Sequence, residues 1–413
     1  MSRRFPHACS VLLVFVLCST TMASEPAPTD LFDHHWQRPL PEQGEPPPGF
    51  TALEASLDAR SCAVCHPQQY LDWQQSRHRQ TLQAGLLWQF QLLTEASANR
   101  CLDCHAPLAE QKALLAGETG WSVTAAKPSA AHIPADLHRQ GLTCAACHLR
   151  KHVRYGPEHR AGLRGDEAGL AHGGFTTHPD FRDSRFCAGC HQFPEDGARL
   201  NGKLRQDTYN QWLASEYAER DIHCQDCHMP NRRHHWHGVN SREGVLQALR
   251  IDLTSRQDEA GQLHWQLRLA NVGAGHHFPA YMASRFDVRL HLLDDSEGEE
   301  VELLHHIIQW RGDDGLRQEL FDHRLPAGAS LERAGTVPLA GREGAALSLR
   351  IDATPKEHYE RLYRQMLQLP DSLSATGREL LELALQEAVA TRYRVIETRI
   401  TAGEGFLHDG SDH

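Results

Sequence analysis

Aromatic residues, long hydrophobic runs and basic residues are all scarce in this 413-residue chain. Aromatic residues make up 7% of the sequence, and the mean hydropathy is -0.52. No apolar stretch approaches the roughly 18 residues that a membrane-spanning helix needs, so no membrane span is expected. Acidic residues outnumber lysine and arginine by 53 to 42, and the formal charge is -11. This charge argues against a nucleic-acid partner and favours partner proteins with basic docking surfaces.

The first 23 residues have the three-part pattern of a signal peptide. Arg3 and Arg4 form a basic start, the run from Val11 to Leu17 is apolar, and Ala23 ends a small-residue cleavage site. We therefore expect cleavage near Ala23 and a mature protein that is periplasmic or extracellular.

After this segment, no cysteine lies outside a single recurring motif. Cys9 and Cys18 belong to the signal peptide, and the other ten cysteines all lie in C-x-x-C-H sequences. The five motifs are Cys62, Cys65, His66; Cys101, Cys104, His105; Cys144, Cys147, His148; Cys187, Cys190, His191; and Cys224, Cys227, His228.

This motif is typical of covalently attached haem. Two thiols at this spacing reach the two vinyl groups of one porphyrin, and the following histidine ligates the iron. A disulfide framework would not require a histidine after every cysteine pair, and four-cysteine zinc sites would use the pairs in twos. We expect five haem c groups, with the ten cysteines as attachment points and the five motif histidines as proximal ligands.

Methionine is too rare to supply the second axial ligands. The mature chain contains only Met229, Met282 and Met366. Met229 adjoins a haem motif and Met366 lies on a predicted helix stripe, so bis-histidine haems are expected. The candidate distal ligands are His78, His138, His178, His234 and His276.

Each candidate has its own sequence context. His78 ends an aromatic helix, Y-x-x-W-x-x-S, that recurs at residues 209–215 with a tyrosine in place of the histidine. His138 precedes the third motif and His178 the fourth. One of His234, His235 and His237 is expected to ligate, because all three closely follow the fifth motif.

His276 follows a glycine-rich turn that suits close approach to a porphyrin. Gly273 and Gly275 permit a tight backbone, and Pro279 fixes the direction in which the chain leaves. We favour His276 over the adjacent His277, so that a C-terminal domain would supply one ligand to the haem domain.

The sequence predicts an α + β multidomain protein, in which a mostly helical and loop multihaem cytochrome domain precedes an immunoglobulin-like β-sandwich with a helical hairpin insertion. Residues 24–60 are proline-rich and predict an extended arm. We expect the pentahaem domain to span residues 61–243 and the sandwich to span residues 244–401. Residues 402–413 are expected to form a disordered tail. Alternating apolar residues predict strands around 249–253, 265–269, 286–292, 347–351 and 393–400. Two helices are expected within about 355–390, the first capped by Thr354.

Together these motifs resemble the multihaem c-type cytochromes grouped with the tetrahaem electron acceptor of hydroxylamine oxidoreductase. The resemblance implies haems stacked in close pairs, with His78, His234 and His276 at positions of distal ligands. It also implies electron transfer, in some relatives within extracellular filaments. The chain departs from the expected continuation, G-G-H, at Val239 and Asn240, so a ligand at that point is absent or replaced. The similar segments are 70–78, 141–148, 186–193, 209–230 and 273–279.

These patterns favour an electron-transfer protein over a catalyst. Pentahaem nitrite reductases attach their catalytic haem through a lysine in place of the motif histidine, whereas all five motifs here end in histidine. Two alternatives stay open. One is an oxidoreductase that acts on hydroxylamine, nitrite or nitric oxide at one open haem. The other is a homo-oligomer or filament subunit whose N-terminal arm, with His34 and His35, donates a ligand to a neighbour.

Overall fold

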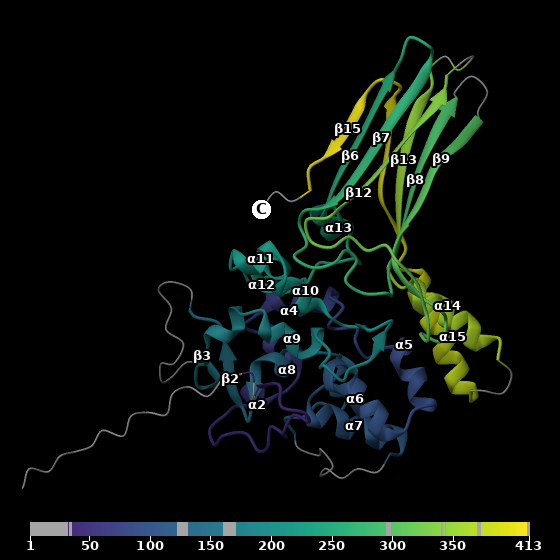
Figure 1. Cartoon of the computed structure of the whole chain (residues 1–413). Coiled ribbons are helices and arrows are strands. Elements are labelled where there is room, and N and C mark those ends of the chain that lie inside the picture. The colour runs from purple at the N-terminus through teal and green to yellow at the C-terminus, as the bar shows by residue number, and fades with distance from the viewer. Residues whose placement is uncertain are drawn as a thin grey trace, which may run out of the picture.

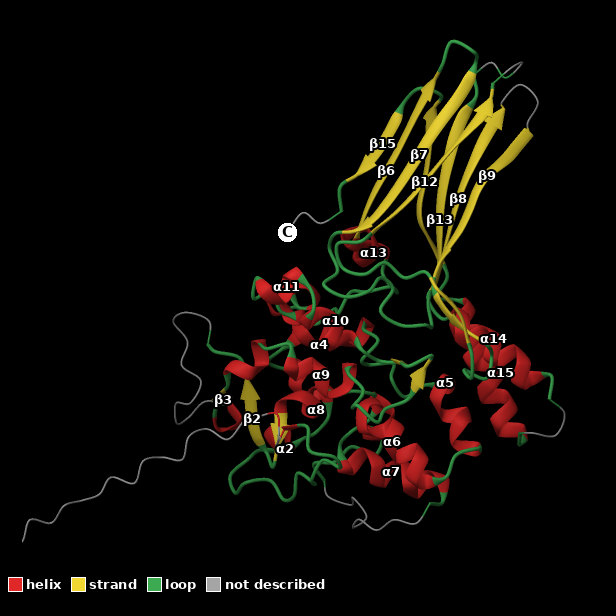
Figure 2. Cartoon of the chain, viewed as in Figure 1, coloured by secondary structure: helices red, strands yellow, loops and turns green. Residues whose placement is uncertain are grey.

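The computed structural model describes residues 32, 35–121, 131–159, 171–294, 299–339, 342, 344–369 and 373–410. The predicted signal peptide, His34 and residues 411–413 lie outside the described residues. Short helices gather in the N-terminal part and long strands in the C-terminal part (Figures 1 and 2). The predicted mixed α + β architecture is therefore confirmed. Within the described ranges, no helix combines the length and apolar composition needed to cross a membrane.

The N-terminal part consists of short helices joined by loops and small strand pairs. Its helices are α2 (Ala52–Ala55), α3 (Ala59–Ala63), α4 (Pro67–Gln75), α5 (Ala84–Leu87), α6 (Glu95–His105), α7 (Ala109–Thr119), α8 (Cys144–His148), α9 (Arg185–His191), α10 (Thr208–Leu213), α11 (Glu216–Glu219), α12 (Cys224–His228) and α13 (Arg242–Ala248). Its strands are β1 (Leu149–Arg150), β2 (Val153–Gly156), β3 (Thr176–Thr177), β4 (Arg199–Leu200) and β5 (Lys203–Leu204).

Four of the five C-x-x-C-H motifs form the last turn of a helix. They end α6 and α9, and they make up the whole of α8 and α12. The first motif begins in α3, and its histidine caps α4. Residues three apart lie on the same side of a helical turn. Both thiols of a motif therefore face the same side, as attachment to one porphyrin requires.

The C-terminal part contains two four-stranded antiparallel sheets with the strand orders β12-β7-β6-β15 and β14-β13-β8-β9. A separate pair is formed by β10 and β11. The strands are β6 (Leu249–Gln257), β7 (Gln262–Asn271), β8 (Arg285–Asp294), β9 (Glu299–Ile308), β10 (Trp310–Gly312), β11 (Glu319–Asp322), β12 (Ser330–Pro338), β13 (Ala346–Thr354), β14 (Tyr393–Thr401) and β15 (Gly405–His408).

One hydrophobic core lies between the two sheets. Inward residues of β6 and β7 meet those of β8 and β13, and side chains such as Leu253, Leu267, Leu290 and Leu349 are almost fully buried. Alternation along each strand places these residues on one face. The five predicted strand segments lie in β6, β7, β8, β13 and β14, so they are confirmed. The immunoglobulin-like relationship stays a prediction.

Three predictions of local structure are wrong. Thr354 is the last residue of β13, paired with Arg285, and the first hairpin helix, α14 (Glu357–Leu367), starts after Lys356. The tail predicted to be disordered contains β15, which pairs with β6 because Phe406 packs against the sheet core. The predicted extended arm folds back from residue 35, since Leu40 and Leu57 are buried with residues of the haem domain.

The helical hairpin connects the two parts of the molecule. Helices α14 and α15 (Ala375–Val389) leave the sheets between β13 and β14 and lie beside α5 (Figure 1). Tyr363 and Leu381 of the hairpin are buried against Ala84 and Trp88. At the base of the sheets, Gly273 packs closely on α13, and a Cβ atom there would lie 2.0 Å from the carbonyl oxygen of Gln247. Only glycine fits at this position.

Candidate haem-binding sites

The cysteine side chains of different motifs contact one another in pairs. Cys62 of the first motif lies next to Cys144 of the third. Likewise the second motif contacts the fourth through Cys104 and Cys190, and the fourth contacts the fifth through Cys187 and Cys224. None of the ten cysteines, all of which are described, is in a disulfide. The motifs are thus packed in an order that differs from their order in the sequence.

Three motif histidines each face a second histidine. The ring centroids of His191 and His78 are 6.2 Å apart. Those of His148 and His234 are 6.3 Å apart, and so are those of His228 and His276, whose planes differ by only 8°. Each pair joins a motif histidine to a predicted distal candidate.

These separations fit an iron atom held between two imidazoles. Metal–imidazole bonds of about 2 Å and ring radii of about 1.1 Å place two coaxial ring centroids about 6.2 Å apart. A direct ring–ring contact would be closer, as in the pair His132 and His152 at 5.3 Å. The residues present therefore fit haem at the third, fourth and fifth motifs.

The Nδ1 atoms of four of the six paired histidines are tied to backbone oxygens. Nδ1 of His148 donates to the Tyr155 carbonyl at 2.8 Å, and Nδ1 of His228 donates to the His237 carbonyl at 2.7 Å. On the distal side, His234 and His276 donate in the same way, at 3.0 Å and 2.9 Å. Because Nδ1 carries the proton, Nε2 keeps its lone pair and is free to ligate a metal.

Burial also keeps these imidazoles uncharged. It lowers the pKa of His78 to about 3, and those of His191, His234 and His276 to about 4. Neighbouring histidines lower the pKa values further. At neutral pH each ring is in the neutral form that metal ligation requires.

The repeated Y-x-x-W-x-x-S segment has the same structural role in both copies. The indole of Trp73 donates to the Leu142 carbonyl, two residues before the third motif, and the indole of Trp212 donates to the Ile222 carbonyl, two residues before the fifth, both at 2.8 Å. Each serine of the repeat, Ser76 and Ser215, donates to the carbonyl of its tryptophan at 2.7 Å. Each copy therefore positions the start of a haem motif.

The two copies then diverge at their final aromatic residue. His78 faces His191, and its Nδ1 is a buried atom without a hydrogen-bond partner among the described residues. Tyr217 of the second copy donates from its hydroxyl to the Val272 carbonyl and packs on Gly275, where a Cβ atom would lie 3.0 Å from the ring. The second copy thereby supports the loop that carries His276.

At the first motif, sequence reasoning missed the best candidate. Burial lowers the pKa of His66, and the nearby His172 lowers it further. Nδ1 of His172 donates to the Gly174 carbonyl at 2.8 Å, as in the paired histidines. The glycine argument applied to His276 also fits the A-H-G-G sequence around His172, so that signal was available.

The second motif has a different environment. Nδ1 of His105 donates to the Thr81 carbonyl at 2.8 Å, but His105 forms no aromatic ring contact within the described part of the chain. Tyr359 of α14 lies near Cys101 of this motif, and 39% of its surface is exposed.

Two predicted distal ligands are directed elsewhere. Nε2 of His138 is 2.6 Å from a carboxylate oxygen of Glu118. Nδ1 of His178 accepts a hydrogen bond from the Asp180 backbone at 3.3 Å. Neither ring faces a motif histidine among the described residues. His35 of the N-terminal arm is buried, and its Nε2 donates to the Cys147 carbonyl at 2.6 Å, so it is not free to reach a neighbouring molecule.

Comparisons with known proteins agree with a multihaem c-type cytochrome. The family model "Cytochrome c554 and c-prime" matches residues 61–148. A penta-heme cytochrome c552 from Thermochromatium tepidum has a similar structure, with a TM-score of 0.57 at 18% sequence identity, covering 84% of this chain and 99% of that chain. At this identity the likeness concerns the fold. A search of curated protein sequences found no match.

Proposed function

We propose that the chain is an exported pentahaem c-type cytochrome that carries electrons through closely packed, mainly bis-histidine haems. When bound, each haem supplies an iron that exchanges one electron. The chain's own residues attach it, ligate it and hold it near the next site. The observation that carries this proposal is the set of three histidine pairs separated by 6.2 to 6.3 Å.

In this proposal the ligands come from distant parts of the chain. His78 serves the fourth motif, His234 the third and His276 the fifth, while His172 serves the first. The buried Asp72 supports the assignment of His234, because it accepts a hydrogen bond from the His234 backbone at 2.9 Å and from Arg233 at 2.7 Å. A ligand in such a fixed segment costs little entropy to hold in place.

The contacts between motifs suggest the route of electron transfer. Cys62 and Cys144 join the first site to the third, and Cys147 of the third lies near Cys187 and Cys190 of the fourth. The fourth site also contacts the second and the fifth. We infer that the fourth haem is the branch point of the route, with the first and third haems on one side of it.

Export follows from the haem chemistry and the N-terminal pattern. C-type haem is attached outside the cytoplasm, which agrees with a signal peptide over residues 1–23. The acidic chain is suited to redox partners with basic docking surfaces. A periplasmic or extracellular location is therefore part of the proposal.

Mass spectrometry and electron paramagnetic resonance of the mature protein test this function. We expect a chain that begins near Ser24 and carries five haems, with low-spin signals from the haems of the paired histidines. Fewer than five covalent haems would contradict the haem count. High-spin signals from most of the haems would contradict the ligand pairs.

A second candidate function is supported by the environment of the second motif. Tyr359 lies near Cys101 of this motif, and Arg205 lies near both Tyr359 and His358. Nε of Arg205 is a buried atom without a hydrogen-bond partner in the described structure. An iron ligated only by His105 would have one open position beside these polar groups. This site would bind a small nitrogen compound such as nitrite or hydroxylamine.

Ligand binding separates the two candidates. If the second haem is open, carbon monoxide should bind one haem of the reduced protein, and nitrite should perturb one high-spin signal of the oxidised protein. Tyr359→Phe should weaken the nitrite effect, whereas Tyr363→Phe, one turn further along α14, should not. A fully low-spin protein that ignores both ligands would exclude this candidate and leave electron transfer.

A further inference from the structure

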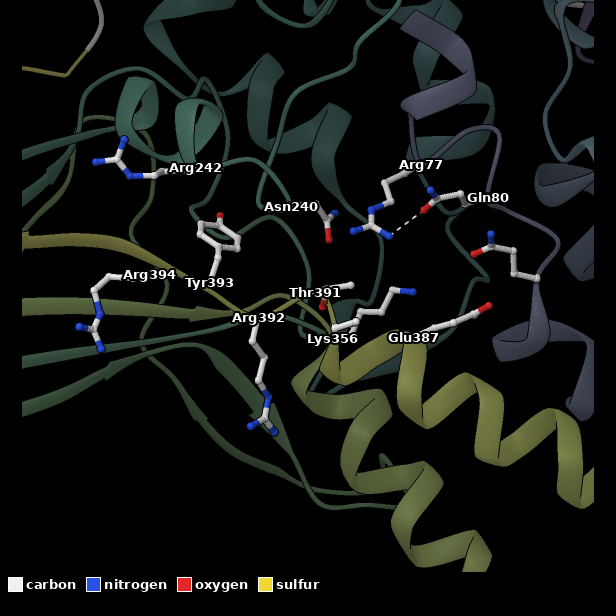
Figure 3. A pocket seen from close by; sticks show the side chains of 12 residues that line it. Arg77, Gln80, Asn240, Arg242, Lys356, Glu387, Thr391, Arg392, Tyr393 and Arg394 are labelled. Atoms are coloured by element: carbon white, nitrogen blue, oxygen red, sulfur yellow. Dashed lines mark hydrogen bonds between the residues drawn. The ribbon is translucent and has the colours of Figure 1, made fainter. Parts of the chain in front are cut away.

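A polar cavity of about 600 Å³ lies where the haem domain meets the hairpin and the end of the sheet. Its lining comes from three places: the loop after α4, the segment before α13, and the ends of α14, α15 and β14 (Figure 3). Neither a cysteine nor a histidine lines it. The cavity is thus distinct from the spaces between the paired histidines.

The cavity is rich in positive charge. Five cationic side chains line it, against the single carboxylate of Glu387. Two of the cations are neutralised by acidic partners outside the lining: Arg392 by Glu360 at 3.0 Å, and Arg394 by Asp352 at 2.9 Å. The other three cations are Arg77, Arg242 and Lys356.

The remaining cations have no carboxylate bonded to them among the described residues. Arg77 donates to the side-chain oxygen of Gln80 at 2.8 Å, and Arg242 donates to the Val395 carbonyl at 2.8 Å. Arg77 and Lys356 extend toward the same space, and Glu387 lies beside Lys356 (Figure 3). Two cations, Arg77 and Lys356, therefore face one carboxylate, and an excess of positive charge remains.

Arg77 and Lys356 are partly buried, so keeping their like charges close together is costly unless an anion joins them. Burial lowers the pKa of Lys356, the charge of Arg77 lowers it further, and Glu387 only partly opposes them. The same space also offers neutral donors, since Asn240 and Thr391 line it. Asn240 is one of the two residues at which the sequence departs from its expected continuation.

We propose that Arg77 and Lys356 clamp an oxyanion in this cavity and thereby join the haem domain to the C-terminal hairpin. Two sources have the required chemistry: the propionate of a neighbouring haem, or a free inorganic oxyanion. Arg77 directly precedes His78, the proposed ligand of the fourth haem, so a propionate of that haem is the first source to test. If the anion is a propionate, the proposal rests on the proposed function, because a propionate requires bound haem. If the anion is a free oxyanion, it does not.

The experiment compares the full-length haem-loaded protein with its Lys356→Met variant, which removes the charge and keeps the length of the side chain. If the anion is a propionate, the reduction potential of one haem falls in the variant, because a cation that disfavours the oxidised state has been lost. Added inorganic phosphate then has no effect on either protein. If the anion is free, phosphate binds the wild type saturably in calorimetry, and the variant binds it at least tenfold more weakly.

Two further variants make the outcome specific. Glu387→Gln removes the opposing carboxylate, so it should shift the same haem potential upward or strengthen phosphate binding. Arg394→Gln changes a cation that lines the cavity but already pairs with Asp352, so it should do neither. The proposal is overturned if Lys356→Met leaves every haem potential unchanged and neither the variant nor the wild type binds phosphate. It is also overturned if Lys356→Met and Arg394→Gln have equal effects. Haem content, measured on the same samples, reveals separately whether the proposed function itself has failed.

Discussion

The hydroxyl of Tyr281 accepts a 2.6 Å hydrogen bond from Nδ1 of His191. The motif histidines of the second, third and fifth sites donate instead to a backbone carbonyl. Tyr281 is contributed by the loop between β7 and β8, and burial raises its pKa to about 12, so the phenol stays protonated. The C-terminal part of the chain thus supplies the hydrogen-bond acceptor for the proximal histidine of the proposed branch point.

Tyr281→Phe should raise the reduction potential of the fourth haem. Without an acceptor at Nδ1, the imidazole becomes a poorer electron donor to iron, and the oxidised state loses stabilisation. A hydrogen bond worth about 1 kcal/mol corresponds to a shift of about 40 mV. Spectroelectrochemical titration measures this shift. Tyr155→Phe is the control, because Tyr155 accepts the hydrogen bond of His148 through its backbone carbonyl, which the substitution keeps. Unchanged haem potentials in both variants would contradict the role of Tyr281.

His78→Ala should produce one five-coordinate haem. The variant removes the ring that faces His191 at 6.2 Å, so the reduced protein should bind carbon monoxide at one haem more than the wild type does. His138→Ala is the matched control, because the bond of His138 to Glu118 points away from the motif histidines. If the two variants give the same low-spin spectrum as the wild type, His78 is not a ligand.

His276→Ala should loosen the connection between the two parts of the molecule. It removes the ring that lies parallel to His228, so one high-spin haem should appear. The C-terminal sheets should then unfold in a separate calorimetric transition, because a shared coordination bond no longer couples them. His277→Ala keeps the backbone carbonyl to which His276 donates, so it should leave both readouts unchanged. A single transition and a low-spin spectrum in His276→Ala would refute the assignment.

Asp72→Asn should weaken the ligand segment around His234. The Asp72 side chain is 2% exposed and bonds to both Arg233 and the His234 backbone. Loss of these charge-assisted bonds should lower the free energy of unfolding by about 2 kcal/mol and add a partial high-spin signal. Asp313→Asn, in the loop between β10 and β11, should change neither the spectrum nor the haem potentials.

The same carboxylate predicts how the wild type responds to acid. Hydrogen bonds from Arg233 hold the pKa of Asp72 well below its ordinary range. A carboxyl group with a depressed folded pKa stabilises the fold above its unfolded pKa of about 3.9 and loses this contribution as the pH falls below it. The wild-type spectrum at the third haem should therefore stay constant from pH 7 to about pH 4. A change centred near pH 6 would contradict this role of Asp72.

Much of the fold was predictable because the sequence carries period-two patterns. The strands from Leu249 to Leu253 and from Phe286 to Leu292 alternate strictly, and the structure buries their apolar faces in one core. The end of the chain was not predictable, because Phe406 is a single aromatic residue in a short polar segment and becomes informative only when the edge of β6 is known. In the same way, the proline-rich composition of the N-terminal arm predicted an extended segment. The burial of Leu40 and Leu57 was therefore not expected, because it depends on distant residues.

The site was predictable only as far as local sequence reaches. The C-x-x-C-H spacing predicts both the attachment points and one ligand, because one helical turn contains them all. A distal ligand is set by tertiary packing, so sequence proximity to a motif is a weak guide. His138 and His178 lie close before motifs and face other groups, whereas His78 faces the motif histidine 113 positions later in the sequence.

The contact between Cys62 and Cys144 has a consequence for how the protein is made. The first and second motifs emerge during synthesis before the third and fourth, which are their packing partners, so neither of the first two can complete its surroundings alone. If haems are attached in the order of the sequence, attachment to the first two motifs would act on chain that has not yet folded. The segment that carries His276 is synthesised after all five motifs. Once this segment folds, it would supply the last ligand to the fifth site, so folding of the C-terminal part would be the final step of maturation.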